Sequence, residues 1–297
     1  MMEVIIKGGK TSGKLPLGIS YNFPQLIIED KRVFEETLKI SLLDDNNENL
    51  EIIVGKSSEI KIILEVTSKQ VVKHNYNLSL TALANSKVTY LLISDLASDN
   101  AVINHKFIAK RDSNLELLGG FVSNVLEAKM SAYLVEENAL VHMRAVAVSS
   151  LDNDQVIDIE LIHDAPYTTG LMHNIAIANA NGRVILNGVE KINQGMIKAD
   201  AYQSLKGIIA SDDATIEVNP ILLIDEHDIK AGHGATVGKL EEVSIYYLMS
   251  RGLTRKDAEK LMINGLLAPL VNEISDEPLK ERFVNLVNER IWFVLEK

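Results

Sequence analysis

The chain of 297 residues contains no cysteine. Disulfide bonds, thiol nucleophiles and metal sites built on thiolates of this chain are therefore excluded. Its seven histidines are widely spaced, without the i, i+4 pair or the His-Glu clusters of zinc enzymes. The sequence consequently shows no self-contained metal site.

Positive charge and long apolar runs are also lacking. The net charge of -11 disfavours binding to nucleic acid, because that attraction needs clustered Lys and Arg. No stretch approaches the roughly 20 continuous apolar residues of a membrane helix, and the first eight residues have no signal-peptide core. We therefore expect a cytoplasmic protein whose partners include neither nucleic acids nor membranes.

From about Leu26 to Ile229 the sequence consists of short runs of Val, Ile, Leu, Thr and Tyr between polar turns. Many of these turns are about 13 to 15 residues apart or a multiple of that, a weak period typical of stacked β-solenoid coils. Asn-Gly hairpin signals are limited to Asn181-Gly182 and Asn187-Gly188, so tight hairpins are not the dominant connection. The pattern favours a β-helix, although a β-sandwich explains evenly spaced short strands equally well.

After Gly238 apolar residues recur at three and four positions, which predicts helices. We expect a core domain over 26–238 between an N-terminal segment over 1–25 and a helical domain over 239–297. The first helix, Glu241 to Arg251, is expected to bury one face and to end at Gly252. The residues expected on that face are Val243, Tyr246, Tyr247 and Leu248.

Two further helices follow in the predicted helical domain. Thr254 is expected to cap the second, which should stop or bend near Pro269. Ser275 is expected to cap the third, whose apolar stripe packs on neighbouring helices or, together with Trp292, docks a partner protein. That stripe comprises Leu279, Phe283, Val287, Ile291 and Leu295.

The most unusual stretch, Asp228 to Gly238, joins the last strands to the first helix. Its three glycines permit close approach of another chain and leave the imidazole of His233 uncrowded. A neutral imidazole can ligate iron or zinc, but a histidine held by turn hydrogen bonds fits the same pattern. Both alternatives remain open on the residues alone.

Two other groups of residues resemble possible catalytic sites. The acidic pairs Asp212-Asp213 and Asp225-Glu226 could serve a β-helical carbohydrate-active enzyme, but they lie in expected turns, where solvated carboxylates are ordinary. The segment around His163 and Thr168 lacks a nucleophile on a sharp turn, so it indicates a hydrogen-bonded corner and not a catalytic triad.

Several motifs of this chain resemble the SufB/SufD family of iron-sulfur cluster assembly proteins. The resemblance covers roughly Leu80 to Leu270 and is firmest from Asp200 onward. Its closing signature is Asn219-Pro220-Ile221-Leu222-Leu223-Ile224, Asp228-Ile229-Lys230, His233-Gly234-Ala235-Thr236-Val237-Gly238 and Tyr246-Tyr247-Leu248-Met249-Ser250-Arg251-Gly252. Upstream, Asp158, His163-Asp164-Ala165-Pro166-Tyr167-Thr168-Thr169, Asn187-Gly188, Gln203 and Ile208-Ile209-Ala210-Ser211 occur in the family's order.

The resemblance implies a right-handed parallel β-helix followed by a small helical domain. It also implies a non-catalytic, SufD-like scaffold that pairs with a SufB-like subunit and docks the SufC ATPase through its helical domain. His233 is then the expected ligand of an iron-sulfur cluster at the partner interface. The other expected interface residues are Asp228, Lys230, Gly234, Tyr246, Tyr247 and Arg251.

The chain departs from the family's pattern in two respects. Ala231 stands where many relatives have a cysteine, and because clusters are held mainly by thiolates, this chain should hold none alone. A transient cluster would form only at the interface with a partner that supplies sulfur ligands. The N-terminal helical domain of larger members is also expected to be absent, since strand-like sequence begins near Leu26.

Two rival functions remain. The first is a homo-oligomeric scaffold that works with the ATPase alone. The second is a carbohydrate-active enzyme, which requires paired carboxylates along a groove of the β-helix.

Overall fold

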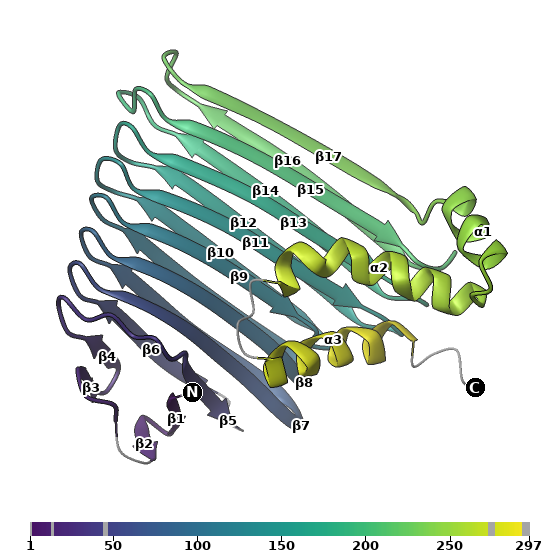
Figure 1. Cartoon of the computed structure of the whole chain (residues 1–297), viewed down its shortest axis with the longest axis horizontal. Coiled ribbons are helices and arrows are strands. Elements are labelled where there is room, and N and C mark those ends of the chain that lie inside the picture. The colour runs from purple at the N-terminus through teal and green to yellow at the C-terminus, as the bar shows by residue number, and fades with distance from the viewer. Residues whose placement is uncertain (1, 13–14, 44–46, 273–276, 293–297) are drawn as a thin grey trace.

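The computed structural model describes residues 2–12, 15–43, 47–272 and 277–292 (Figure 1). The strands are β1 Met2–Lys7, β2 Lys10–Ser12, β3 Ile19–Asn22, β4 Gln25–Ile28, β5 Leu38–Leu43, β6 Asn47–Val54, β7 Glu59–Ala82, β8 Lys87–Ala109, β9 Asn114–Phe121, β10 Leu126–Leu134, β11 Leu140–Ser149, β12 Asp154–His163, β13 Thr169–Ala178, β14 Arg183–Ile192, β15 Asp200–Ile209, β16 Thr215–Ile224 and β17 Lys230–Lys239. The helices are α1 Glu242–Ser250, α2 Arg255–Val271 and α3 Glu277–Trp292.

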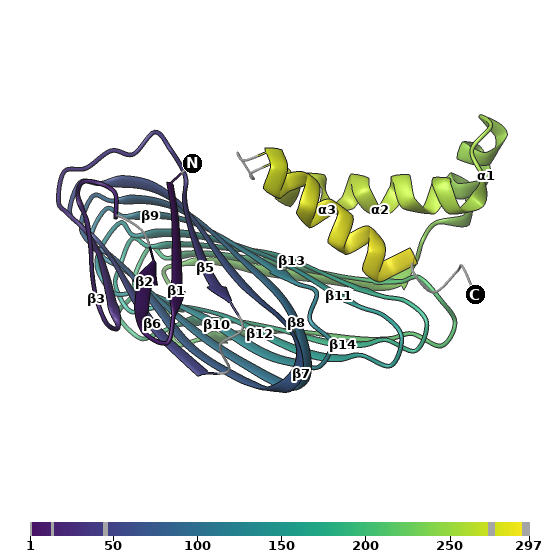
Figure 2. The same cartoon turned by 90° about the horizontal axis from the view of Figure 1, so that it is seen from below.

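The strands form a parallel β-solenoid of about seven turns. One ladder contains β10, β12, β14 and β16, and the other contains β9, β11, β13, β15 and β17. The long strands β7 and β8 contribute to both ladders (Figure 2). The predicted parallel β-helix is therefore confirmed, and the β-sandwich alternative is wrong.

The register explains the weak sequence period. Leu126 pairs with Gln155, Asp154 with Arg183 and Thr169 with Asp200, so hydrogen-bonded neighbours are 29, 29 and 31 residues apart. One coil contains two strands and two turns. The spacing of about 13 to 15 residues seen in the turns is thus half a coil.

Side chains alternate between the interior of the solenoid and its outside. Strand β14 shows this most regularly, with every second residue from Val184 to Ile192 buried. The interior side chains of successive coils stack on one another and form the main hydrophobic core. Fully burying each Leu, Ile or Phe contributes roughly 1.5–3 kcal/mol, so stacking of coils supplies most of the stability.

Helices α2 and α3 lie against the outer face of the β9–β17 ladder (Figure 2). Phe283, Val287 and Ile291 of α3 are fully buried in a second core, which includes outward-facing Leu118 and Val148 of the sheet. Polar contacts join the same surfaces, since Arg290 donates to Asn124 at 2.9 Å and pairs with Asp95 at 3.3 Å. Phe283, Val287 and Ile291 of the predicted stripe therefore pack on the solenoid and also on the neighbouring helix α2, which belongs to the same core.

The first helix differs from its prediction. Ile245 is its buried residue, whereas Val243, Tyr246 and Tyr247 are 74%, 62% and 58% exposed. The apolar residues of α1 were assigned to the wrong face because α1 extends beyond the end of the sheet and touches it little (Figure 1). Gly252 does end the helix with a positive φ of 98°.

The second helix begins and ends where the sequence predicts. The amide of Asp257 donates to Thr254 Oγ1 at 3.1 Å, so Thr254 is the N-cap. The helix ends at Val271, two residues after Pro269, which agrees with the prediction that it stops near this proline. Ser275, Leu295 and the side chains of Leu279 and Trp292 lie outside the described residues.

Residues of the expected N-terminal segment also form strands, and β1 joins the ladder parallel to β5. Over the described ranges, no helix has both the length and the apolar character required to cross a membrane.

The contact between α3 and the sheet depends on a glycine. A Cβ built at Gly120 would lie 2.3 Å from Cε2 of the buried Phe283. We predict that Gly120→Ala lowers the free energy of unfolding by about 1–3 kcal/mol, because the Phe283 ring must shift. Denaturant titration measures this. Gly234→Ala is the control, since no atom lies within 4 Å of its Cβ position; equal stability of the two variants contradicts the prediction.

Candidate functional site

The last coil of the solenoid, β16 and β17, forms an open end (Figure 1). Among the described strands, β16 pairs only with β14 and β17 only with β15. Ile192 of β14 and Ile224 of β16 occupy the same column of the interior, but the first is fully buried and the second is 39% exposed. We call these two strands the terminal edge, which presents both free backbone groups and apolar side chains.

His233 lies on the terminal edge. It pairs in register with Gln203 of β15, whose side chain is fully buried inside the solenoid. Side chains in register on parallel strands point the same way, so the imidazole of His233 lies on the interior side of its coil. Because no described coil follows, the imidazole is exposed, between the small side chains of Ala231 and Ala235.

Gly234 follows His233 and lies on the opposite face of β17, in register with Ser204. The space beside it is open, because nothing lies within 4 Å of its Cβ position. This strand therefore allows close approach from outside as well as from the open end.

Two charged residues hold the beginning of β17 to the preceding coil. Lys198 donates from Nζ to Asp228 Oδ1 at 2.6 Å and from its amide to the Asp228 carbonyl at 2.6 Å. This contact raises the pKa of Lys198. Lys230 Nζ lies 4.0 Å from Asp200 Oδ2 and is largely exposed. Asp228 thus stabilises the turn before β17. The ammonium of Lys230 projects from the beginning of β17, the strand that also carries His233.

The remaining predicted interface residues lie elsewhere. Six residues of extended strand separate His233 from Lys239, where β17 ends, which is about 20 Å at 3.3 Å per residue. Tyr246, Tyr247 and Arg251 follow on α1, with the Arg251 guanidinium 5.2 Å from the ring centre of Tyr247. The structure therefore separates the predicted residues into the terminal edge and a second region.

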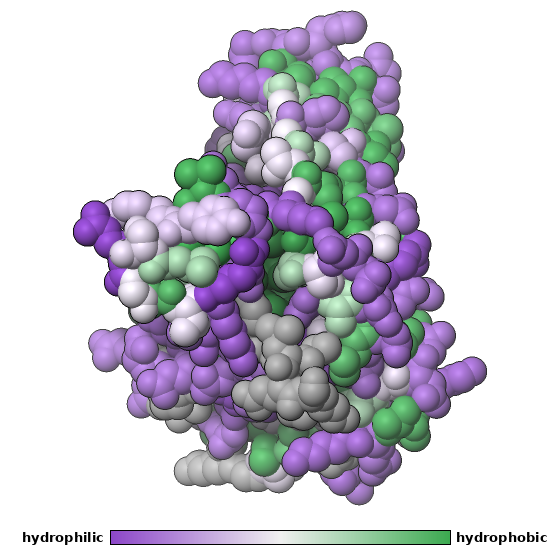
Figure 3. Space-filling model, turned by 90° about the vertical axis from the view of Figure 1, so that its right-hand side faces the viewer, coloured by the Kyte–Doolittle hydropathy of each residue, from purple (hydrophilic) through white to green (hydrophobic). Residues whose placement is uncertain are grey.

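We call this second region the α1 surface and define it by Val243, Tyr246, Tyr247 and Arg251. It is exposed and rich in large apolar side chains. Figure 3 views the molecule from the side that carries α1 and shows exposed apolar side chains (green) between hydrophilic ones (purple).

Buried polar groups lie behind His233 in the solenoid interior. Gln203 donates from Nε2 to the Ile221 carbonyl at 2.8 Å, while its Oε1 has no hydrogen-bond partner. Glu190 of β14 is fully buried with neither carboxyl oxygen hydrogen-bonded. Burial, and to a lesser extent the charge of Asp200, raises the pKa of Glu190 to about 8. Glu190 is therefore protonated at neutral pH.

His163 belongs to the same interior, one coil further from the open end. Its Nδ1 lies 2.7 Å from Thr168 Oγ1, which in turn donates to the Ala165 carbonyl at 3.0 Å. The predicted hydrogen-bonded corner is confirmed. Burial lowers the pKa of His163 to about 4, so its imidazole is neutral.

Sequence reasoning did not identify Glu190 as an interior residue. The signal lies in the register, since Glu190 pairs with Leu161 in one direction and Leu222 in the other. A polar residue in an otherwise apolar column becomes visible once residues about one coil apart are aligned.

The terminal edge offers a single imidazole and no thiolate. Within the described part of the chain, no three His, Asp or Glu side chains are grouped closely enough to hold a metal ion. A metal or cluster bound at His233 would need its other ligands from another molecule.

Comparison with known proteins assigns the family. The model of the SufBD core domain of the SUF system for FeS cluster assembly matches residues 43–266. The chain belongs to the SufBD core family. The match includes the terminal edge and α1, whereas α3 lies beyond it.

Individual SufBD relatives agree with this assignment. The chain is 32% identical to the iron-sulfur cluster assembly protein SufD of Bacillus subtilis over 70% of its own length and 48% of the relative. It is 29% identical to SufD of Escherichia coli, over 66% and 44% respectively. A SufBD family protein of Pyrococcus horikoshii is 28% identical over 77% and 52%. The chain is thus SufD-like and spans about half the length of these relatives.

The buried Glu190 gives a pH prediction. Its pKa rises from 4.5 to about 8 on folding, so its contribution to stability is present below pH 4.5 and is lost as the pH rises towards 8. Glu190→Gln replaces the protonated acid with a neutral amide. Between pH 6 and pH 9 the parent should lose on the order of 3 kcal/mol of its free energy of unfolding as Glu190 ionises. We predict that Glu190→Gln does not show this loss.

Urea titrations at the two pH values measure this difference. Glu217→Gln is the control, because Glu217 is an exposed partner of Arg183 at 3.4 Å. Parallel pH profiles for the parent and Glu190→Gln would show that Glu190 is not protonated in the folded state.

Proposed function

We propose that this chain is a scaffold subunit of iron-sulfur cluster assembly in the SUF system. In this proposal it pairs through its terminal edge with a SufB-like subunit. The observation that carries the proposal is the open end of the solenoid, in a chain whose family is named for this process. A parallel ladder that stops with exposed Ile224 and Val237 is a template for another strand.

The chemistry of the edge supports a partner with a similar coil. A second family member can extend both ladders by backbone hydrogen bonds and cover the open interior column. Gly234 and the alanines beside His233 permit that close approach. A second copy of this chain could pair in the same way, which is the homo-oligomeric alternative.

His233 is the residue we assign to the cluster. The cluster is cargo and not a resident cofactor, and the chain contributes one imidazole to it while the partner supplies thiolates. Such sharing explains how a chain without cysteine can take part in cluster assembly. It also requires His233 to lie at the partner interface.

The acidic pairs that could suggest a carbohydrate-active enzyme have structural roles. Asp212 forms an ion pair with Lys239. Glu226 accepts the amides of Gly195 and His227, which lowers its pKa. A general acid needs the opposite shift, so these residues favour the scaffold.

The first test replaces His233 in the complex. We predict that His233→Ala leaves folding and co-purification with the SufB-like subunit intact, because the imidazole is exposed on the edge. Anaerobic reconstitution should then give markedly less of the visible iron-sulfur absorption per complex. His227→Ala in the exposed turn before β17 is the matched control. A normal cluster yield from His233→Ala would refute the assignment.

We further propose that the α1 surface docks the SufC-type ATPase. Tyr246 and Tyr247 expose large rings that fold stability does not need, as expected of binding anchors. The double variant Tyr246→Ser, Tyr247→Ser should weaken binding of the ATPase at least tenfold in calorimetric titration, without lowering the melting temperature. Val33→Ser, an exposed position near the other end of the solenoid, is the control. Unchanged affinity would exclude this surface.

A further inference from the structure

A cationic cavity lies on the outer face of β11, β13 and β15, beside α2. Its volume is about 380 Å³, and its polar lining includes His142, Arg144, His173 and Lys206. No acidic residue is among the described residues that line it. Its two cations are Lys206 and Arg144, of which Arg144 is paired with Glu116, and the imidazoles add hydrogen-bond donors, so the lining suits an anionic group.

Hydrogen bonds fix the direction in which the two histidines donate. Arg144 can only donate, and its Nη2 lies 2.8 Å from His142 Nδ1. His142 therefore carries its proton on Nε2 and donates it to His173 Nδ1 at 3.0 Å. The neutral His173 therefore carries its own proton on Nε2. This N–H is not used in the contacts with His142 and Arg144 and remains a donor.

Glu116 stabilises the position of Arg144 in this series of contacts. Its Oε2 lies 3.3 Å from Arg144 Nη1 and forms an ion pair with the guanidinium, whereas the same oxygen, 3.3 Å from the unprotonated His142 Nδ1, makes no hydrogen bond to it. Burial, His142 and Arg144 lower the pKa of His173, which keeps it neutral at physiological pH. Arg144 and the two imidazoles are thus held in place before any ligand arrives.

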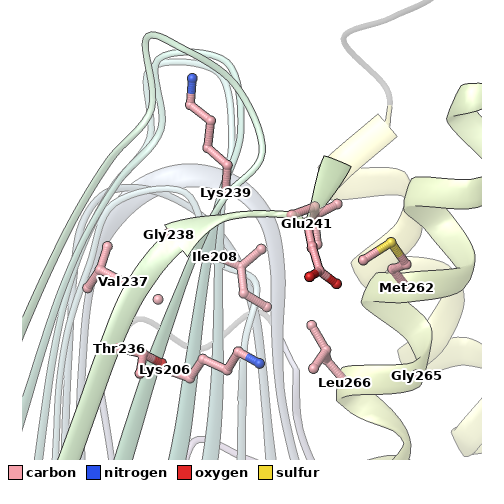
Figure 4. A pocket seen from close by; sticks show the side chains of 12 residues that line it. Lys206, Ile208, Thr236, Val237, Gly238, Lys239, Glu241, Met262, Gly265 and Leu266 are labelled. Atoms are coloured by element: carbon pink, nitrogen blue, oxygen red, sulfur yellow. The ribbon is translucent and has the colours of Figure 1, made fainter. Parts of the chain in front are cut away.

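A second hollow adjoins the first and is largely apolar. Its volume is about 430 Å³, and it shares Lys206 and Leu266 with the cationic cavity. Figure 4 shows the Lys206 ammonium directed towards Leu266 of α2, with Ile208 and Met262 lining the space between sheet and helix. The Glu241 carboxylate also points into this hollow, so an anionic group is disfavoured there.

We propose that the two hollows form one binding site for a small organic anion with an apolar portion, either a phosphate monoester or a carboxylate. The anionic group accepts hydrogen bonds from His173 and Lys206 near Arg144. The apolar portion lies along Leu266 and Met262. Repulsion by Glu241 sets this orientation and excludes the reverse one.

The site lies on the outer face of the sheet and uses neither His233 nor the α1 surface. A negative result for this site would therefore leave the proposed role in cluster assembly unaffected, and the reverse also holds. Both classes of ligand share one negative head and one apolar tail, so hexyl phosphate and hexanoate are suitable probes.

Isothermal titration of the full chain at low salt tests the proposal. We expect saturable 1:1 binding of hexyl phosphate or hexanoate, whichever head group fits better, and at least fivefold weaker binding of inorganic phosphate and of hexanol. Lys206→Gln and His173→Gln should each weaken the preferred probe by roughly tenfold, the usual effect of losing one charge-assisted or well-aligned hydrogen bond. Both side chains are exposed, so neither change threatens folding.

Lys61→Gln is the matched control. Lys61 is an exposed lysine in register with Thr89, which pairs with Glu116, so it lies on the same face of the sheet but outside the cavity. The Nε2 resonance of His173 should shift on binding of the preferred probe. The proposal is overturned if neither probe saturates, or if Lys206→Gln and Lys61→Gln bind the preferred probe equally well.

Discussion

Stacking of each coil on the next is the interaction on which this molecule depends. A side chain inside the solenoid is covered most completely where a coil lies on both sides of it. Ile192 has such neighbours and is fully buried, whereas Ile224, in the same column one coil later, is not. The same repetition that stabilises the fold therefore leaves an uncovered surface at the last coil. His233 lies on that surface.

The outer face of the solenoid has a related requirement. The β9–β17 ladder carries apolar side chains on its outside, and α2 and α3 cover them. This packing uses the apolar stripe of α3 and leaves α1 beyond the sheet with its rings exposed. His233 and the α1 surface are thus separated by the rest of β17, an arrangement that suits the proposed scaffold with two partners.

The half-coil spacing of the polar turns allowed either a β-helix or a β-sandwich, and the resemblance of the motifs to the family decided for the β-helix. The caps at Thr254 and Gly252 were predictable for a local reason, since a hydrogen bond and a positive φ involve adjacent residues. The face of α1 was not predictable, because helical spacing cannot say which side meets the sheet.

Among the candidate site residues, His233 was predicted from its glycine-rich surroundings and its family motif, and its role stays a prediction. Its separation from Tyr246, 13 positions later, was not evident, since the residues after His233 span a long distance only because they continue the extended strand to Lys239. Glu190 and the pair formed by His142 and His173 depend on contacts between strands about 30 residues apart. Such contacts follow from the register of the ladders, which one sequence without a structure does not provide.

The most direct test of the central claim is hydrogen–deuterium exchange of the chain, alone and mixed with the SufB-like subunit. The account predicts that the amides of β16 and β17 exchange fast in the isolated chain and become protected in the complex, while β12 and β13 are protected in both. Complex formation without added protection at β16 and β17 would contradict the claim that the open end of the solenoid is the partner interface.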